Sequence, residues 1–171
     1  MAGRLVSRKP TMDDFERFFA IHADPLTNRF NPAGPLKDRE EARGRLDAWI
    51  RHWQEHGYGQ WAVATADEPA HVIGFGGIAL RDYLGVARVN LGYRFDVAVW
   101  GKGYATALGL QAQNFAFHEL RLPEVFGLVR PAHAASIRVL EKIGMLRIGT
   151  LDDVPGAAPS LVYRSASDYQ L

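Results

Sequence analysis

The stretch Asn90-Leu-Gly-Tyr-Arg-Phe-Asp-Val-Ala-Val-Trp-Gly-Lys-Gly-Tyr-Ala-Thr-Ala-Leu108 decides how the chain is interpreted. Its first half is a strand candidate, and two glycines, Gly101 and Gly103, stand directly before a helical pattern. A helix N-terminus exposes unpaired N–H groups and a partial positive charge, and glycine lets a ligand approach the backbone closely. The stretch therefore predicts a strand, a glycine turn and a helix start suited to a phosphate.

The elements on either side of this stretch predict a mixed α/β fold. No internal repeat or linker interrupts the 171 residues, so we expect a single domain, 1–171, with six or seven strands and about four helices. Helices are expected at 11–25, 38–55, 101–120 and 134–143, and strands at 5–7, 60–66, 71–80, 86–95, 125–129, 145–151 and 160–164.

The best-defined helix is the one predicted from about Asp38 to Glu55. Its apolar residues recur at the spacing of one helix face, which predicts that this face, including both tryptophans, packs into the core. The residues are Ala42, Leu46, Trp49, Ile50 and Trp53. Further upstream, Thr11 is expected to cap the first helix, with two aspartates in its first turn.

Composition and charge exclude several functional classes. The chain has no cysteine, so disulfides, thiolate metal sites and a cysteine nucleophile are impossible. Lys plus Arg number 20 against 19 for Asp plus Glu, which gives no broad basic surface for nucleic acid. No apolar run reaches the roughly 20 residues of a membrane span, and the N-terminus lacks a signal-peptide pattern. We expect a cytoplasmic protein without a nucleic-acid or membrane partner.

Other glycine-loop and metal interpretations fit less well. The spacing of a P-loop is absent, and the acidic residue that follows the second strand of a dinucleotide-binding unit is replaced by Arg130. His52 and His56 have a metal-ligand spacing on one helix but no third ligand, so a solvated helix face and no metal site are expected. An open alternative is that the glycines only form a tight turn, in a domain made for interaction.

Two motifs in register carry a family resemblance. Trp100-Gly-Lys-Gly-Tyr-Ala-Thr106 resembles the acetyl-CoA pyrophosphate loop of the GNAT-superfamily N-acetyltransferases, and most of all that of the ribosomal-protein-alanine acetyltransferases. About 30 residues on, Val129-Arg-Pro-Ala-His-Ala-Ala-Ser-Ile-Arg-Val-Leu-Glu-Lys-Ile-Gly-Met145 resembles the second coenzyme motif of the same branch. Leu91-Gly-Tyr93 resembles the strand that this branch places beside the pantetheine arm.

The resemblance implies where acetyl-CoA, the co-substrate, would bind. In this family it enters a V-shaped opening between two parallel strands, which here are Val86 to Phe95 and Val125 to Val129. The backbone near Phe95 is expected to pair with pantetheine, and the glycine turn to hold the pyrophosphate. The coenzyme residues implied in this way are Phe95, Trp100, Gly101, Lys102, Gly103, Tyr104, Ala105, Thr106 and His133.

Four positions depart from the family pattern. Trp100 replaces the Arg or Gln common in the superfamily but agrees with the branch, and Asn90 stands where relatives often carry a glutamate that can move a proton. His133 replaces an Asn and either contacts the coenzyme or is only a polar residue at a helix start. Leu140 replaces a Tyr general acid, so Ser136 is the candidate that hydrogen-bonds the coenzyme sulfur, unless it is only a first-turn serine.

The resemblance also implies the reaction and leaves its acceptor open. The expected activity is acetyl transfer to a primary amine, on a peptide N-terminus or a small molecule, by direct attack in a ternary complex. Arg29 and Phe30, in the loop between the first two helices, are the candidates for acceptor binding, and Asn90 and Ser136 for catalysis. A homodimer is also expected to be possible. The alternative, suggested by Asn90, Leu140 and His133, is a weak or inactive CoA-binding regulatory module.

Overall fold

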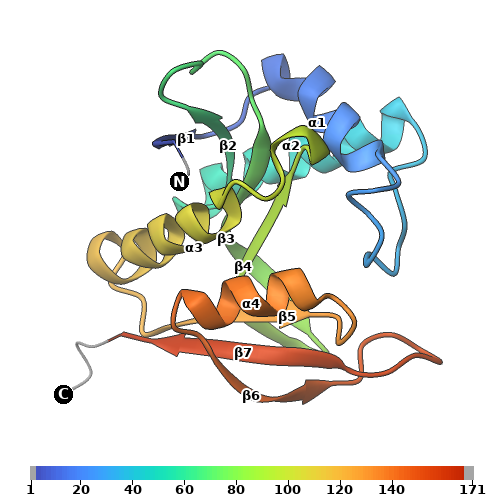
Figure 1. The fold of residues 1–171 in the computed structure, drawn as a ribbon, viewed down its shortest axis with the longest axis vertical. Helices are drawn as coiled ribbons and strands as arrows, with labels where there is room; N and C mark the ends of the chain where they lie inside the picture. Colours follow the sequence, from blue (N-terminus) through green and yellow to red (C-terminus); the bar gives the residue numbers. More distant parts are fainter. Residues whose placement is uncertain (1–2, 168–171) are drawn as a thin grey trace.

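The computed structural model describes residues 3–167, which build one seven-stranded sheet in the order β1-β2-β3-β4-β5-β7-β6 (Figure 1). Every neighbouring pair is antiparallel except β4 and β5, which run parallel. The strands are β1 (Leu5–Arg8), β2 (Gln60–Thr65), β3 (Gly74–Tyr83), β4 (Val86–Phe95), β5 (Glu124–Val129), β6 (Leu146–Leu151) and β7 (Ser160–Ala166). The mixed α/β architecture expected from the sequence is therefore confirmed.

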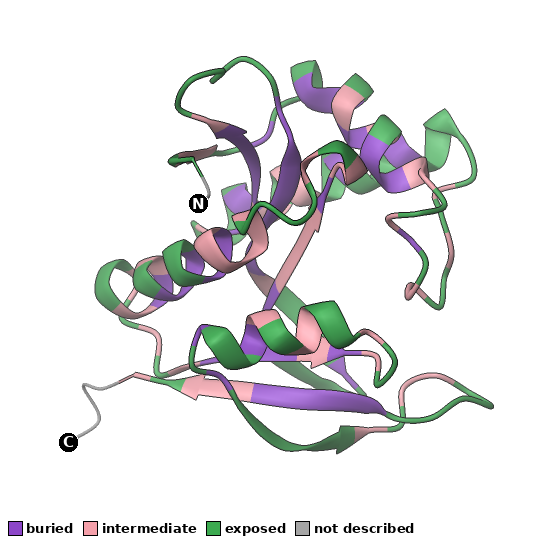
Figure 2. Ribbon diagram, viewed as in Figure 1, coloured by how far each residue is buried: buried purple, intermediate pink, exposed green. Residues whose placement is uncertain are grey.

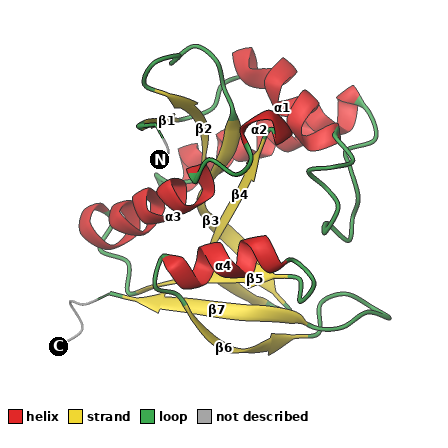
Figure 3. Cartoon of the chain, viewed as in Figure 1, coloured by secondary structure: helices red, strands yellow, loops and turns green. Residues whose placement is uncertain are grey.

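Helices cover both faces of this sheet (Figure 3). On one face, α3 and α4 pack over a large apolar cluster, and on the other α1 and α2 pack over a second cluster. The outward sides of α3 and α4 are exposed, whereas the strands beneath them are largely buried (Figure 2). The α-helices within residues 3–167 are α1 (Phe15–Ala23), α2 (Arg39–His56), α3 (Tyr104–Asn114) and α4 (Ala134–Lys142).

The predicted helix starts and the amphipathic face of α2 are confirmed. Thr11 caps the short 3-10 turn η1 (Met12–Asp14) that leads into α1, and its capping box with Asp14 is complete. Asp38 caps α2, and Gly57 ends it in a left-handed conformation at φ 74°. Ala42, Leu46 and Trp53 are buried, and Trp49 and Ile50 pack against the same clusters.

Several predicted boundaries differ from the structure. The first helix, expected at 11–25, is α-helical over Phe15–Ala23, and the helix expected from 101 begins at Tyr104. The strand expected at 71–80 begins at Gly74 and continues to Tyr83, because β3 pairs with β4 along its whole length up to a two-residue turn at Leu84 and Gly85. The helix expected to reach residue 120 is α only to Asn114. It continues as the π-turn η3 (Phe115–Glu119), in which the Leu120 amide bonds the Phe115 carbonyl. Phe115 then packs 5.3 Å from the Trp61 ring.

The seam between β4 and β5 is the feature that positions the site. These strands pair only at Asn90 with Phe126 and at Leu91 with Gly127, although β4 extends four residues further. Beyond that point the two strands separate, and the chain of β4 leads through the 3-10 turn η2 (Val97–Val99) to the start of α3. The sheet is thus open along one seam, at the carboxyl ends of its two parallel strands. None of the helices described in residues 3–167 is long and apolar enough to span a membrane.

Candidate functional site

Peptide groups of β4 face the gap where its pairing with β5 has ended. The Asp96 amide bonds the Ile73 carbonyl of the β3 side at 2.9 Å. In an antiparallel ladder the directly opposed residues alternate between bonded and non-bonded pairs. The peptide groups of the even-numbered residues of β4 therefore point toward β3, and those of Tyr93 and Phe95 point into the gap. An extended ligand arm lying in the gap would meet them as a neighbouring strand does.

The start of α3 offers free backbone amides beside this gap. Gly101 and Gly103 have φ values of 75° and 83°, in the left-handed region that glycine adopts without a steric penalty. Gly103 is the N-cap of α3, and no side chain caps the helix there. The first amide of this turn with a backbone partner is that of Ala107, which bonds the Gly103 carbonyl at 3.1 Å. The amides before it are available to an anion.

Trp100 connects the glycine turn back to the gap. Its indole N–H donates to the Phe95 carbonyl at 2.9 Å, while half of its surface, 51%, stays exposed. The Phe95 carbonyl is therefore already hydrogen-bonded within the chain. The N–H of Phe95 is the backbone group that still faces the gap and is available to a ligand. Lys102 is exposed, and Tyr104, Ala105 and Thr106 are half-buried along the first turn of α3.

A pair of hydroxyl groups bridges the opening from β4 to α4. The Tyr93 Oη and Ser136 Oγ atoms lie 2.8 Å apart, and either can be the donor. Burial raises the pKa of Tyr93 to about 12, although the bond to Ser136 acts in the opposite direction. Tyr93 therefore keeps its proton at neutral pH. Sequence analysis singled out Ser136 but not its partner, and the only signal for Tyr93 was its place in the Leu-Gly-Tyr strand.

The coenzyme candidate His133 and the acceptor candidate Phe30 lie in contact. Their rings stack with centroids 4.3 Å apart, which joins the loop between α1 and α2 to the start of α4. Arg29 lies over the Phe30 ring at 5.4 Å. Burial, and next the charge of Arg94, lower the pKa of His133, so it is neutral at physiological pH. This contact places the two sets of candidates at one end of β4.

Asn90 lies at the closed end of the seam. It is buried, and its Oδ1 atom accepts a hydrogen bond from the Tyr83 hydroxyl at 2.5 Å, while Nδ2 donates to the Leu91 carbonyl at 3.2 Å. Burial raises the pKa of Tyr83, so this donor also stays protonated. The amide of Asn90 is therefore held by its neighbours where β4 still pairs with β5.

A depression of about 340 Å³ lies between α3 and α4, next to the glycine turn. Thr106 lines it from α3, and Arg138 and Lys142 line it from α4. The two basic residues are spaced i, i+4 and so lie on one helix face, a pattern that the sequence shows but that sequence analysis did not use. They add positive charge beside the amides of α3, although the Glu141 carboxylate lines the same depression.

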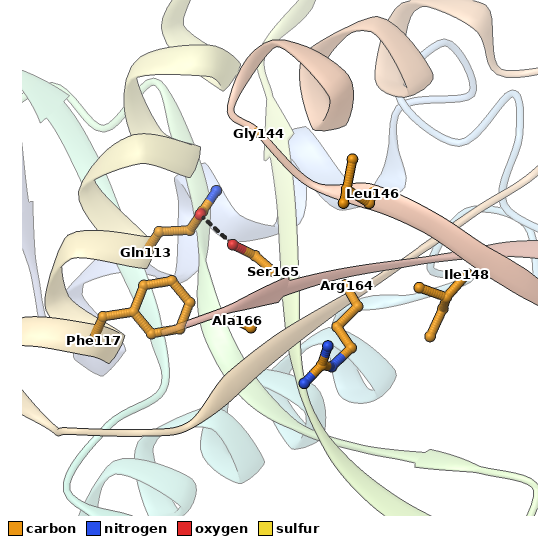
Figure 4. A pocket seen from close by; sticks show the side chains of 8 residues that line it. All are labelled: Gln113, Phe117, Gly144, Leu146, Ile148, Arg164, Ser165 and Ala166. Atoms are coloured by element: carbon orange, nitrogen blue, oxygen red, sulfur yellow. Dashed lines mark hydrogen bonds between the residues drawn. The ribbon is translucent and has the colours of Figure 1, made fainter. Parts of the chain in front are cut away.

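A second cavity lies elsewhere, at the opposite end of β5 (Figure 4). Its volume is about 410 Å³, and it is lined by the second half of α3, β6 and the end of β7. The Gln113 side chain lines the cavity. It accepts a hydrogen bond from Ser165 at 2.9 Å and donates one to the Ile143 carbonyl at 3.2 Å. Gly144, near the end of the second coenzyme motif, lines this cavity, but none of the candidate coenzyme, catalytic or acceptor residues does.

His52 has a structural role that the sequence did not predict. Its Nδ1 atom lies 2.8 Å from the Tyr58 carbonyl, and its Nε2 atom accepts the Leu80 amide at 3.1 Å. This pairing requires the neutral ring with its proton on Nδ1. The expectation of a simply solvated face at this position is therefore wrong, because the ring ties α2 to β3. In residues 3–167 no group of three or more His, Cys, Asp or Glu is arranged to hold a metal.

Comparison with known proteins matches the chain to one family model. The acetyltransferase (GNAT) domain family matches residues 4–146. The chain is 30% identical over 139 residues to a probable N-acetyltransferase of Bacillus subtilis, YjcK, covering 80% of this chain and 70% of that protein. It is also 30% identical over 110 residues to B. subtilis YkkB, covering 64% of this chain and 63% of that one, which is less than two thirds of the relative's length.

Solved structures confirm the fold. Spermidine N-acetyltransferase from Vibrio cholerae, in complex with CoA and spermine, superimposes with a TM-score of 0.77 at 16% identity, covering 96% of both chains. Ribosomal-protein-S5-alanine acetyltransferase from Vibrio fischeri gives 0.73 at 18% identity, covering 99% of this chain and 96% of that one. The ribosomal-protein branch is thus one of several structural neighbours, and the resemblance holds at the level of the superfamily.

Acetyl-CoA, the co-substrate of this family, fits what the chain provides. Peptide groups face an open seam, and a run of uncapped helix amides stands beside it, which are the two features that an extended arm and a pyrophosphate require. With this fit and the match over residues 4–146, the chain belongs to the GNAT family of acetyltransferases and is an acyltransferase.

Proposed function

We propose that the chain transfers the acetyl group of acetyl-CoA to a primary amine by direct attack in a ternary complex. The observation that carries the proposal is the seam between β4 and β5. It opens after two residue pairs, directly beside the uncapped start of α3. When bound, acetyl-CoA supplies the acetyl thioester on which the reaction depends. In the reaction the amine nitrogen bonds the acetyl carbon, the carbon–sulfur bond breaks, the nitrogen loses a proton and the sulfur gains one.

The chain's own residues have three tasks in this proposal. The amides from Gly101 to Thr106 bind the pyrophosphate, with Lys102 and the basic residues of α4 nearby. The N–H groups of β4 that face the seam, including that of Phe95, position the acetyl arm and stabilise negative charge that develops on its carbonyl oxygen. Trp100 fixes the turn against Phe95 through its indole.

The third task is proton delivery. Ser136 donates the proton that the departing sulfur takes up, Tyr93, 2.8 Å away, replaces it, and water returns a proton to Tyr93. Because burial raises the pKa of Tyr93 to about 12, the phenol is protonated at neutral pH and its hydroxyl is present as a hydrogen-bond donor to Ser136. Asn90 acts by position only, since an amide does not titrate, and the amine loses its proton to water. Phe30, stacked on His133, and Arg29 border the acceptor.

Two of the structural neighbours suggest two kinds of acceptor. One structural neighbour is a spermidine acetyltransferase and another acts on the alanine of ribosomal protein S5, so a polyamine and a peptide N-terminus both enter the trial panel. Fold alone does not choose between them, because acceptor choice resides in the site. A small-molecule amine of another kind completes the panel.

The decisive experiment combines binding with turnover. Purified protein is heated with and without CoA, and the release of free thiol is followed with acetyl-CoA and the amine panel. We expect CoA to raise the melting temperature, because a ligand of the native state stabilises it, and at least one amine to release thiol. Tight CoA binding without turnover on the whole panel would establish the regulatory-module alternative. Absence of any CoA effect would leave the glycine turn as a structural feature of an interaction domain.

A further inference from the structure

Arg94 is an uncompensated positive charge on the acceptor side of β4. Its cross-strand partner is Phe75, which belongs to the cluster under α1 and α2, so the Arg94 side chain lies on that face. Tyr93, one residue earlier, lies on the opposite face, because successive residues of a strand alternate. The backbone of Arg94 therefore lies between Tyr93 and Phe95, and its guanidinium is on the face of the sheet opposite the hydroxyl pair.

The protein gives this guanidinium a neutral partner and no carboxylate. Its Nη1 atom donates to Asn28 Oδ1, and no acidic side chain in residues 3–167 forms an ion pair with it. Burial, and next the charge of Arg45, lower the pKa of Arg94. Removal of a charge from water is unfavourable unless it is paired, and most half-buried arginines have an acid for this reason.

Asn28 is itself held so that it presents its oxygen to Arg94. It is buried, and its Nδ2 atom donates to the carbonyls of His22 and Asp24, each at 2.8 Å. Its Oδ1 atom also accepts from Asn31 at 2.9 Å, which leaves that oxygen fully used. The asparagine thus orients the guanidinium but does not neutralise it.

The remaining N–H groups of Arg94 are open to a ligand. Within the part of the chain that the structure describes, no fully buried side-chain nitrogen or oxygen lacks a hydrogen-bond partner. Since Nε and Nη2 of Arg94 have no partner within the described residues, these atoms retain contact with solvent. Together they form the planar fork that binds a carboxylate through two parallel hydrogen bonds.

From this geometry we infer that the acceptor is an amine that also carries a carboxylate, which Arg94 binds while the amine reaches the seam. The inference rests on the proposed function and names its substrate class. A polycation such as a polyamine meets Arg94, Arg45 and Arg29 on the same side and is repelled. The chain therefore differs in acceptor from the spermidine enzyme that its fold resembles.

The test compares amines that differ only in the anionic group. Thiol release with acetyl-CoA is measured for α-, β- and γ-amino acids, for the neutral amide of each, and for spermidine. We expect kcat/KM for at least one acid to exceed that of its amide by about tenfold or more, the usual value of a hydrogen-bonded charge, with spermidine lowest. Calorimetry of the same pairs with the CoA-loaded protein gives a second measurement that needs no turnover.

Variants assign the preference to this side chain. Arg94→Gln should raise KM for the acid to that of the amide and so abolish the preference between them, and Arg94→Lys should keep part of the preference because it keeps the charge but loses the fork. The matched control is Arg51→Gln, which removes an exposed arginine of α2 that pairs with Asp47. Melting temperatures with and without CoA verify that each variant is folded.

The outcomes separate the inference from the proposed function. Turnover with equal or better rates on amides or spermidine overturns the inference and leaves the acetyltransferase proposal intact. If no amine releases thiol, the proposed function fails, and calorimetry decides the binding claim: acids must bind more tightly than amides in a manner that Arg94→Gln abolishes. Equal binding of acid and amide overturns it in either case.

Discussion

Removal of either hydroxyl of the Tyr93–Ser136 pair should slow acetyl transfer far more than it destabilises the fold. The atoms lie 2.8 Å apart in a partly buried setting, and a neutral hydrogen bond of this kind stabilises a protein by about 1 kcal/mol. A positioned proton donor contributes about 100-fold or more to the rate. We therefore expect Ser136→Ala to lower kcat by about 100-fold and Tyr93→Phe by about tenfold. The double variant should be no slower than Ser136→Ala, because residues that act as a unit are not additive.

The assay is single-turnover thiol release from preloaded acetyl-CoA, run from pH 6 to 10 beside urea unfolding of each variant. The pKa of Tyr93, raised to about 12 by burial, is above its unfolded value, so the neutral phenol persists throughout this range. Its contribution to stability is present below the unfolded pKa and is lost as the pH rises through the folded pKa. The kcat profile should consequently show no break from Tyr93 below about pH 11.

A control elsewhere in the chain separates catalysis from packing. Ser165 donates to Gln113 at 2.9 Å at the far end of β5, so Ser165→Ala should cost a similar amount of stability and leave kcat unchanged. If Ser136→Ala and Tyr93→Phe unfold more readily but turn over at the wild-type rate, the hydroxyl pair is structural. The proton then reaches the sulfur by another route.

Three further predictions concern the glycine turn, a buried histidine and the packing beneath α3. Gly103→Glu should abolish the CoA-dependent rise in melting temperature. The control Gly156→Glu, at a similar positive φ in an exposed loop, should keep that rise while losing a similar stability of about 1 kcal/mol. Normal CoA binding by Gly103→Glu contradicts the pyrophosphate assignment. Burial, more than the nearby charges of Arg94 and Arg45, lowers the pKa of His22 to about 3. The unfolded chain therefore binds an extra proton, and the free energy of unfolding falls as the pH drops below about 6.5, by up to about 1.4 kcal/mol per pH unit. His22→Gln should flatten the pH dependence of the urea midpoint, and an unchanged slope refutes the assignment. Gly76→Ala places a methyl group 2.5 Å from a leucine of α3 and 2.7 Å from a β4 carbonyl, so the free energy of unfolding should fall by about 1–3 kcal/mol. Gly44→Ala, with open space around it on helix α2, should raise the free energy of unfolding by up to about 1 kcal/mol. Thermal unfolding measures both.

Local patterns in the sequence were sufficient for most of the fold. The helix α2 was predictable because its apolar spacing, its Asp38 cap and its Gly57 stop agree with one another. The bounds of β4 were predicted as observed, since a turn and the glycine motif enclose it. The start of β3 was placed three residues early, because His71 to Ile73 continue the apolar pattern and only long-range pairing decides where the ladder begins. The π-turn at Phe115 leaves no mark in helical periodicity.

The site was predictable where it is made of backbone and much less so where it is made of side-chain contacts. Gly101 and Gly103 identify the uncapped helix start because glycine adopts their positive φ values without a steric penalty. The Tyr93–Ser136 bond joins residues 43 apart, and the Phe30–His133 stack joins residues more than 100 apart, so no local pattern contains either contact. Arg94 was read as part of a strand, and its missing counter-charge becomes visible only when every neighbour in the fold has been placed.

The opening between β4 and β5 also determines how the molecule holds together. The sheet consists of an antiparallel block, β1 to β4, and a smaller antiparallel block, β5 to β7. Only two residue pairs between β4 and β5 join the two blocks. A ligand bound in the opening contacts both blocks and should hold them together. Amides of β6 and β7 should then exchange with deuterium more slowly in the loaded enzyme, although these two strands do not border the opening.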